Sequence, residues 1–255
     1  MLGCSPAAAE TGSAEREGPD DGKIHLGSDV KAYVTAPLHA RRAQWVRFGA
    51  VLGGIGAAYH YDADVRAHFQ SGASLPSAPP DTHDSRDAVP AALAVGGTFL
   101  AAVLLDSDDG RREAGSMVEA AAFSSAAAYV LKQAAGRERP FVTGDPGNWG
   151  TSDDSFPSTH TAAAFAIGTV LAESGDDRYR WVRRVLGYGI AGRTAYARID
   201  HDAHWFSDTV AGAGLGIATA RFVMKRRNRT NEAARFEIRP SEAGIQLRYT
   251  VALRP

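Results

Sequence analysis

The sequence predicts an all-α fold, a bundle of helices that ends in a short C-terminal β-hairpin. Ala and Gly are abundant, and apolar residues recur at helical spacing through most of the 255 residues. A long alternation of apolar and polar residues occurs only within the last twenty residues, which predicts the hairpin. A chain of this length forms one large domain or two small ones, and no clear boundary divides it.

We therefore divide the chain into three parts. Residues 1–22 are expected to form a disordered tether, because they are acidic and rich in Ala, Ser, Gly and Pro. Residues 23–232 are expected to form the helical domain, and residues 233–255 a C-terminal β-hairpin extension. The formal net charge is −1, so no global field attracts nucleic acid, and any anion site must be local.

The N-terminal residues Met1-Leu2-Gly3-Cys4-Ser5 are similar to the end of a bacterial lipoprotein signal, although the charged and apolar regions of such a signal are missing. One interpretation is that translation starts upstream and that Cys4 is lipidated. The protein would then lie in the bacterial cell envelope, in the periplasm and anchored to a membrane surface. The alternative is an ordinary disordered N-terminus. Cys4 is the only cysteine, which excludes an intrachain disulfide and a thiolate metal cluster.

The first half of the chain contains helical segments separated by Pro-rich or polar stretches. Segment 41–61 carries Trp45, Phe48 and Val51 at helical spacing, and segment 62–70 is a short amphipathic helix. Pro-rich residues 71–84 predict a loop and residues 106–112 a polar turn. The helices expected in this half cover residues 29–39, 41–61, 62–70 and 87–105.

The second half begins with a long helix over residues 113–135, which Gly136 caps and Pro140 prevents from continuing. Residues 141–155 predict a Gly-, Pro- and Asp-rich loop that borders the expected site with Trp149. The helices expected after it cover residues 158–174, 179–198 and 204–227. Residues 236–251 alternate around a turn at 240–244 and form the expected hairpin.

The most apolar run, residues 89–105, is seventeen residues long and contains Pro90, Gly96 and Gly97. That length is at the lower edge of what crosses a bilayer. The other apolar helices carry charged residues or His. We therefore expect helices that are mostly buried against one another, in a water-soluble or membrane-attached domain and not in a multispanning protein.

Three short pieces between residues 132 and 208 carry the chemistry. The first runs from Lys132 to Pro140, the second is Pro157-Ser158-Thr159-His160, and the third runs from Arg198 to Asp208. They combine cations, amides at a helix start and two histidines. Cleavage of a phosphate ester needs these groups, to neutralise the phosphoryl oxygens, to attack phosphorus and to protonate the leaving oxygen.

The cations are Lys132, Arg139 and Arg198, of which the arginines offer a rigid fork that suits phosphate oxygens. Ser158 and Thr159 stand where a helix opens, so their backbone amides and the Ser158 hydroxyl can bind an anion. We expect Pro157 in the first helical turn. Any one of these cations alone would be read as part of a surface salt bridge; together with the histidines they predict a phosphate site.

His204 and Asp208 are four residues apart, so on a helix they share one face. A carboxylate on one ring nitrogen leaves the other nitrogen free to attack. We therefore predict His204 as the nucleophile, Asp208 as its orienting partner and His160 as the general acid. Asp200, His201 and Asp202 could form a metal site, but a solvated turn is the preferred interpretation. We therefore predict no metal.

The pattern K-x6-R-P, P-S-x-H and R-x5-H-x3-D resembles that of the type 2 phosphatidic acid phosphatase (PAP2) superfamily, which includes bacterial class A acid phosphatases and vanadium haloperoxidases. The resemblance covers roughly residues 85–228. Its register selects Arg139 over Arg137 and His204 over His201. The family usually has Gly where this chain has Thr159, which puts the range of substrates in question.

The resemblance implies a PAP2/haloperoxidase-like helical bundle with its site at the helix ends, and hydrolysis of phosphomonoesters or diphosphates without a metal or cofactor. It also implies a phosphohistidine intermediate and inhibition by vanadate. Lipid phosphates are the expected substrates if Cys4 is lipidated, and soluble phosphomonoesters the alternative. Two other functions stay open: a vanadate-dependent haloperoxidase, and a non-catalytic envelope lipoprotein that binds an anion. The sequence makes no prediction of oligomeric state.

Overall fold

The computed structural model describes residues 26–71, 88–105, 107–175, 177–241 and 244–251. Its elements follow one another along the chain as α1 (Leu26–Thr35), η1 (Ala36–His39), α2 (Arg42–His60), α3 (Asp62–Gln70), α4 (Val89–Leu104), α5 (Asp108–Ala135), α6 (Pro140–Thr143), α7 (Thr159–Glu173), η3 (Asp177–Tyr179), α8 (Arg180–Asp200), α9 (Phe206–Ala233), β1 (Ala234–Ser241) and β2 (Gly244–Val251). The expected tether with Cys4 and almost all of the expected loop at 71–84 lie outside the described residues.

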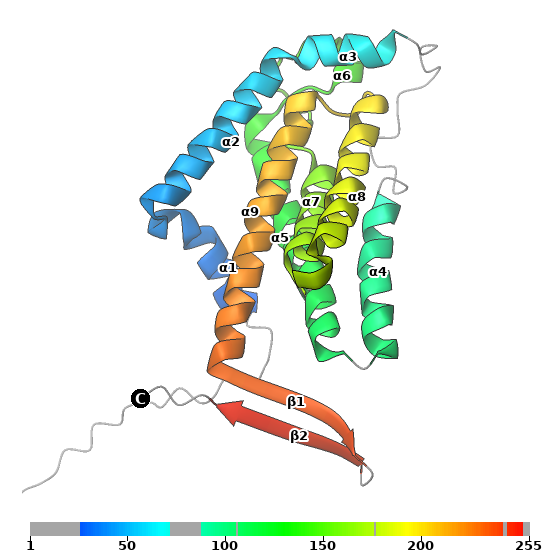
Figure 1. Cartoon of the computed structure of the whole chain (residues 1–255). Coiled ribbons are helices and arrows are strands. Elements are labelled where there is room, and N and C mark those ends of the chain that lie inside the picture. Colours follow the sequence, from blue (N-terminus) through cyan, green and yellow to red (C-terminus); the bar gives the residue numbers. More distant parts are fainter. Residues whose placement is uncertain (1–25, 72–87, 106, 176, 242–243, 252–255) are drawn as a thin grey trace, which may run out of the picture.

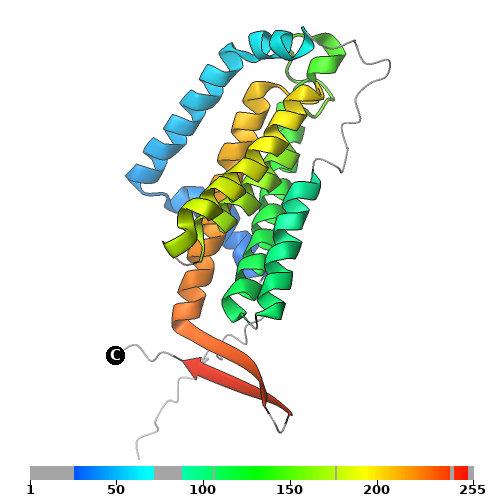
Figure 2. The same cartoon turned by 45° about the vertical axis from the view of Figure 1, so that its right-hand side comes forward.

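A bundle of long helices confirms the all-α prediction. Helix α7 lies at its centre and packs against α5, α8 and α9, while α4 packs along α5. Helix α2 forms an outer arm beside α9, and α3 continues from that arm across the end of the bundle where α6 lies (Figure 1). Figure 2, a view turned by 45°, shows α4 and α5 running side by side.

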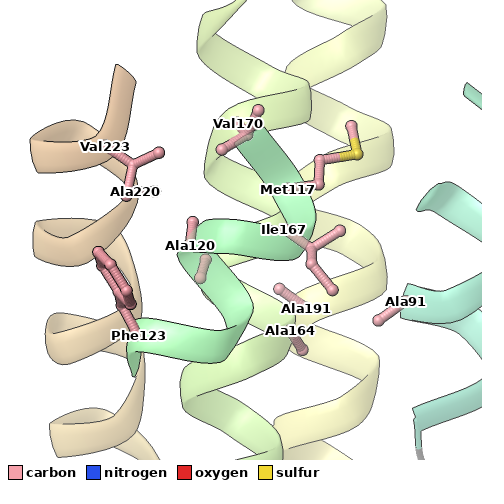
Figure 3. Close-up of a cluster of buried hydrophobic side chains, with 11 residues drawn as sticks. Ala91, Met117, Ala120, Phe123, Ala164, Ile167, Val170, Ala191, Ala220 and Val223 are labelled. Carbon is pink, nitrogen blue, oxygen red and sulfur yellow. The ribbon is translucent and has the colours of Figure 1, made fainter. Parts of the chain in front are cut away.

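The core of the bundle is built mainly from small side chains. Met117, Ala120 and Phe123 of α5 cluster with Ala164, Ile167 and Val170 of α7 (Figure 3). Ala91 of α4, Ala191 of α8, and Ala220 and Val223 of α9 complete the cluster. The many alanines let the helices approach closely, and each buried large apolar side chain contributes about 1.5–3 kcal/mol.

Helices α7 and α8 touch backbone to backbone at Gly168 and Gly187. A Cβ atom on Gly187 would lie only 2.3 Å from the carbonyl oxygen of Gly168, so no larger residue fits there without movement. This contact fixes α8 against the central helix. Helix α8 carries Arg198 in its last turn.

Several boundaries differ from the expectation. The expectation of a polar turn at 106–112 is wrong from residue 108 on, because α5 begins at Asp108. The Ser107 hydroxyl caps this helix by accepting a hydrogen bond from the Gly110 amide. The loop expected at 141–155 contains the end of α6, which Pro140 opens as its first residue. Helix α8 continues to Asp200, and α9 begins at Phe206, two residues after His204.

Strands β1 and β2 pair antiparallel at the C-terminal end of the chain, with Ala234 opposite Val251 and Ser241 opposite Gly244. They continue from α9 at the end of the bundle opposite to α3 and α6 (Figure 1). The strands are thus remote from the helix ends that carry the motif residues, and we assign them no part in the site.

Large apolar side chains are exposed on the outer helices. The expectation that the helices are mostly buried against one another is wrong for α2, in which only Ala58 is buried. By length and composition, one described stretch, Asp109–Thr143, could cross a membrane, and Val89–Ala101 is a shorter apolar helix. The exposed side chains on α2, α4 and α8 include Trp45, Val46, Phe48, Leu52, Leu93, Phe99, Leu100, Trp181, Val185 and Leu186.

Candidate active site

The residues singled out in the sequence gather at one end of the bundle, beside α3 and α6 (Figure 1). Lys132 lies in the last turn of α5 and Arg198 in the last turn of α8. Arg139 is the N-cap of α6 and Ser158 the N-cap of α7. His204 lies in the turn between α8 and α9, and Asp208 in the first turn of α9. The helix ends therefore bring together residues that are far apart in sequence.

Gly136 ends α5 and determines the direction in which the chain continues to Arg137 and Arg139. It ends the helix in a left-handed conformation with φ 53°, and its amide donates to the carbonyl of Lys132 at 3.0 Å. A side chain there would lie 2.3 Å from the backbone oxygen of Thr151. Glycine therefore lets the chain reverse tightly, so that the next residues, Arg137 and Arg139, point back into the bundle end.

Lys132 is 5% exposed, and its ammonium group donates to the backbone oxygens of Asp154 and Ser155. Burial, partly offset by the nearby charge of Asp154, lowers the pKa of Lys132 to about 8. At neutral pH the group is therefore mostly protonated and available to an anion. Above that pH it becomes neutral.

Arg139 lies beside the ring of His204. Its Nη1 donates to the backbone oxygen of Ala203 at 3.0 Å and lies 3.5 Å from Nε2 of His204. Its Nε and Nη2 donate to Oδ1 of Asp154 at 3.1 and 2.6 Å. Asp154 is partly exposed, with 41% of its side chain accessible. An incoming phosphate would therefore compete with this carboxylate for Arg139.

Arg198 and His160 complete the positive surroundings of His204. Arg198 is fully buried, and its carbonyl accepts the amides of Ala203 and His204, both at 3.1 Å, which fixes the turn before α9. His160 is the second residue of α7 and is half-buried. The charges of both residues contribute to lowering the pKa of His204.

Ser158 is fully buried and ties α7 to α9. Its amide donates to the backbone oxygen of Asp208 at 3.1 Å, and its hydroxyl accepts from the amide and the hydroxyl of Thr161. The hydroxyl therefore acts as a helix cap, and its binding to phosphate stays a prediction. Pro157 precedes this cap, so the expectation that it occupies the first turn is wrong. Thr159 begins α7 without a positive φ, so the backbone does not require Gly there.

His204 and Asp208 are neighbours, but not because they share a helix face. His204 precedes α9, so the helical premise of the prediction is wrong, although Nδ1 of His204 still lies 3.5 Å from Oδ2 of Asp208. That nitrogen makes no hydrogen bond within the described residues. Nε2 points to Arg139 instead. The ring thus has one nitrogen towards the carboxylate and one towards the cations.

Burial and charge set the protonation of this pair in opposite ways. His204 is 3% exposed, and burial, followed by the charges of Lys132, Arg139, Arg198 and His160, holds its pKa well below the usual range. Burial raises the pKa of Asp208, which the charge of Arg137 and the hydroxyl of Ser155 oppose. A neutral imidazole at physiological pH has a free electron pair, which a nucleophile needs.

Asp208 sits at the centre of a buried hydrogen-bond network. Its Oδ1 accepts from Nη1 of Arg137 at 2.7 Å, and its Oδ2 accepts from the Ser155 hydroxyl and from the Trp205 amide. The register of the motif favoured Arg139 and passed over Arg137, yet Arg137 is fully buried and pairs with Asp208. Its position directly after the capping Gly136 was the only sequence signal available.

A metal site formed by Asp200, His201 and Asp202 is not assembled. The carboxylate of Asp202 accepts two hydrogen bonds from Arg66, at 2.8 and 2.9 Å. Within the described part of the chain, no group of three or more His, Cys, Asp or Glu side chains could hold a metal ion. The arrangement can hold a tetrahedral anion through cations and present it to a neutral imidazole.

Comparisons with known proteins identify one family model, one curated relative and one solved structure. Residues 113–232 match the family model of the PAP2 superfamily. A stretch of 68 residues is 43% identical to the lipid A 1-phosphatase of Porphyromonas gingivalis, and it covers 27% of this chain and 15% of that relative. The chain thus spans only a small part of the length of that curated relative. The crystal structure of Aquifex aeolicus LpxE is similar with a TM-score of 0.43 and 20% identity, over 64% of this chain and 94% of that chain.

Proposed function

Because residues 113–232 match the family model of the PAP2 superfamily, we propose that this chain belongs to it and is a phosphatase that hydrolyses phosphate monoesters through a phosphohistidine on His204. The observation that carries the proposal is the setting of the His204 ring. Nδ1 faces Asp208 at 3.5 Å and Nε2 faces Arg139 at 3.5 Å. A phosphoryl group held by the cations would therefore meet Nε2.

In the first step, Nε2 of His204 attacks phosphorus and the bond from phosphorus to the leaving oxygen breaks. His160 gives its proton to that oxygen. The oxygens of the transferred group are held by Lys132, Arg139 and Arg198 and by the amides at the start of α7. The His204 ring becomes cationic, with its proton on Nδ1, and the carboxylate of Asp208 stabilises that charge.

In the second step, a water molecule attacks the phosphohistidine. His160, now neutral, takes a proton from the water, and the bond between phosphorus and Nε2 breaks with its electron pair returning to the ring. Inorganic phosphate leaves. His160 ends protonated and His204 neutral, so the site is restored. Vanadate would inhibit the enzyme, since it can adopt the five-coordinate geometry of either transition state.

We propose that the substrates are lipid phosphates and that the enzyme acts at a membrane surface. The similar stretch of the lipid A 1-phosphatase from Porphyromonas gingivalis supports this, as do the exposed apolar side chains on α2, α4 and α8. Extensive exposed apolar surface on a protein marks contacts with lipid or with another protein. Attachment through a lipidated Cys4 would place the protein in the cell envelope.

The proposal is tested by phosphate release from p-nitrophenyl phosphate and from a lipid phosphate in vesicles, both with a chelator present. We expect turnover without added metal and inhibition by vanadate. His204→Ala should lower kcat by at least roughly 10³-fold, because it removes the nucleophile. Labelled substrate and rapid acid-free quenching should trap phosphohistidine in the wild type and none in the variant.

His201→Ala is the matched control, because it removes the other histidine of the same turn. It should keep activity within about threefold of the wild type, as expected of a residue outside the chemistry. Full activity in His204→Ala would remove the nucleophile assignment. Bromination that depends on vanadate and peroxide, without phosphate release, would favour a haloperoxidase instead.

A further inference from the structure

Asp62 lies far from the motifs in sequence but at the back of the candidate site. It is the first residue of α3, outside the region that matches the family, and its side chain is fully buried. Oδ2 accepts from Nη2 of Arg137 at 2.7 Å and from the Ser207 hydroxyl at 2.6 Å. Oδ1 accepts from the Ser207 amide at 2.8 Å. The carboxylate thus has several donors and no access to water.

Arg137 joins this carboxylate to Asp208. Its Nη2 donates to Asp62 and its Nη1 to Oδ1 of Asp208, each at 2.7 Å. Aromatic rings enclose the guanidinium, with its Cζ 4.5 Å from the ring centre of Trp149, 5.2 Å from that of Tyr59 and 5.3 Å from that of Trp205. One rigid, buried fork therefore holds two carboxylates at fixed positions.

We propose that Asp62 is a positioning residue, which sets the charge and the orientation of Asp208 through Arg137 and thereby prepares His204 for attack. This inference rests on the proposed phosphatase function only for its effect on turnover. Its effect on the charge of His204 can be measured without substrate. The N-terminal arm of α2 and α3 would then be part of the catalytic unit, although it lies outside the family region.

The charges explain why two carboxylates are needed. Arg137 and Asp208 alone would form a neutral pair, which offers little stabilisation to a cationic His204. Asp62, Arg137 and Asp208 together carry one net negative charge, which lies on the Asp208 side of the imidazole. That charge must act against positive groups on several elements around His204. These are Lys132 of α5, Arg139 before α6, His160 of α7 and Arg198 of α8, while Asp154 on the loop before α7 acts in the same direction as Asp208.

A competing explanation is that Asp62 only anchors α3. A second ion pair provides the comparison, because Arg66 of the same helix binds Asp202 in the turn before His204, at 2.8 Å. Both pairs attach α3 to the bundle, but only Asp62 reaches Asp208 through Arg137. Loss of Arg66 should therefore loosen α3 and leave the carboxylate of Asp202 without its partner, while the contacts among Asp62, Arg137 and Asp208 stay intact.

The experiment compares Asp62→Asn, Asp62→Glu and Arg66→Gln in the full chain. Asn keeps the shape of Asp62 and its acceptor oxygen but removes the charge, whereas Glu keeps the charge and adds a methylene. The titration of the His204 ring is followed by NMR of isotope-labelled histidine, with His204→Gln used to assign the signal. The pH profiles of kcat and KM on p-nitrophenyl phosphate and the thermal unfolding midpoint are measured beside it.

We expect Asp62→Asn to lower the pKa of His204 further and to reduce kcat roughly tenfold or more with KM almost unchanged, as for a loss felt in the transition state. Asp62→Glu should be less damaging than Asp62→Asn. Arg66→Gln should lower the unfolding midpoint but should not lower the pKa of His204, because it removes a cation and leaves Asp202 unpaired. This ordering is the reverse of that expected for a packing role, in which the isosteric Asn is the milder change.

An unchanged His204 titration in folded Asp62→Asn, or greater damage from Glu than from Asn, would overturn the inference. A wild type without phosphatase activity, in which Asp62→Asn still shifts the His204 titration, would leave the inference standing and remove the proposed function. If Asp62→Asn does not fold, Asp62→Ser takes its place, because it also removes the charge: a lowered His204 midpoint supports the inference, and an unchanged midpoint overturns it.

Discussion

Oδ2 of Asp208 lies 3.5 Å from Nδ1 of His204, whereas it accepts full hydrogen bonds from the Ser155 hydroxyl and the Trp205 amide. The carboxylate is thus held in place by groups other than the histidine it faces. In the neutral resting site the pair need not be in contact. In the proposed mechanism a positive charge on the ring draws the two together, so the interaction would be strongest when His204 carries the phosphoryl group.

Asp208→Asn tests this relationship. Asn can keep the acceptor for Trp205 but offers no charge to a cationic ring, so we expect kcat to fall roughly 10²-fold or more while KM changes little. Steady-state kinetics on p-nitrophenyl phosphate measure both. Asp200→Asn, at the exposed end of α8, is the control and should behave like the wild type. A kcat within a few-fold of the wild type in Asp208→Asn would show that the carboxylate is dispensable.

Lys132 gives the site an alkaline limit. Burial lowers its pKa to about 8, so this cation is lost as the pH rises through that value, when the substrate phosphate is already fully ionised. We expect kcat/KM to fall above pH 8, mainly through a higher KM. A bound phosphate favours the protonated lysine, so the corresponding limb of kcat should lie at higher pH.

Lys132→Arg is the informative variant for this limit, because a guanidinium stays charged throughout the range. It should flatten the fall of kcat/KM between pH 7.5 and 9.5 even if the maximum is lower. Lys132→Gln should weaken binding at every pH. The same alkaline fall in the wild type and in Lys132→Arg would assign the limit to another group.

Local signals in the sequence were sufficient to place most of the candidate site. Gly136 and Ser158 mark a helix end and a helix start, so Lys132, Arg139 and the start of α7 could be assigned to one end of the bundle. The pairing of Arg137 with Asp62 could not be predicted, because it joins residues 75 positions apart. Nothing local distinguishes Asp62 from Asp64, which is exposed on the same helix.

The outer face of α2 could not be predicted for a different reason. Apolar periodicity indicates a helix, but it does not say what covers the apolar side chains. Trp45 and Phe48 fit the pattern of a buried helix, and both are about half exposed. The boundary errors are of the same kind: the hydrogen bond of Ser107 decides where α5 starts, and the sequence shows only that such a cap is allowed.

The close crossing of α7 and α8 predicts that replacement by alanine has opposite effects on stability at two glycines of α8. A Cβ on Gly187 would lie 2.3 Å from the backbone of Gly168, whereas a Cβ on Gly189 would meet nothing within 4 Å. We expect Gly187→Ala to destabilise the fold by about 1–3 kcal/mol, because the helices must separate. Gly189→Ala should stabilise it by about 0.5–1 kcal/mol, as in any exposed helix interior.

Denaturant unfolding of the two variants measures this difference, with the wild type between them. Since both changes add the same methyl group to the same helix, intrinsic helix propensity cancels in the comparison. Equal stabilities would mean that α7 and α8 are not in backbone contact. A drop in activity that accompanies Gly187→Ala would show that the crossing also positions Arg198 at the end of α8.

The exposed aromatic side chains of α2 predict how the protein meets its substrate. Trp45 and Phe48 are 53% and 52% exposed, their ring centres lie 5.8 Å apart, and α2 has no acidic residue. We expect the double variant Trp45→Ser and Phe48→Ser to bind anionic vesicles at least roughly tenfold more weakly, since each ring buried in lipid contributes about 1.5–3 kcal/mol.

Co-sedimentation with vesicles measures the bound fraction. Hydrolysis of a lipid phosphate in those vesicles should fall in parallel. Hydrolysis of soluble p-nitrophenyl phosphate should stay at the wild-type rate, because Trp45 and Phe48 lie in the first half of α2, away from the end that joins α3. Loss of both activities together would mean that these side chains support the fold, and unchanged vesicle binding would mean that the membrane contact lies on another face.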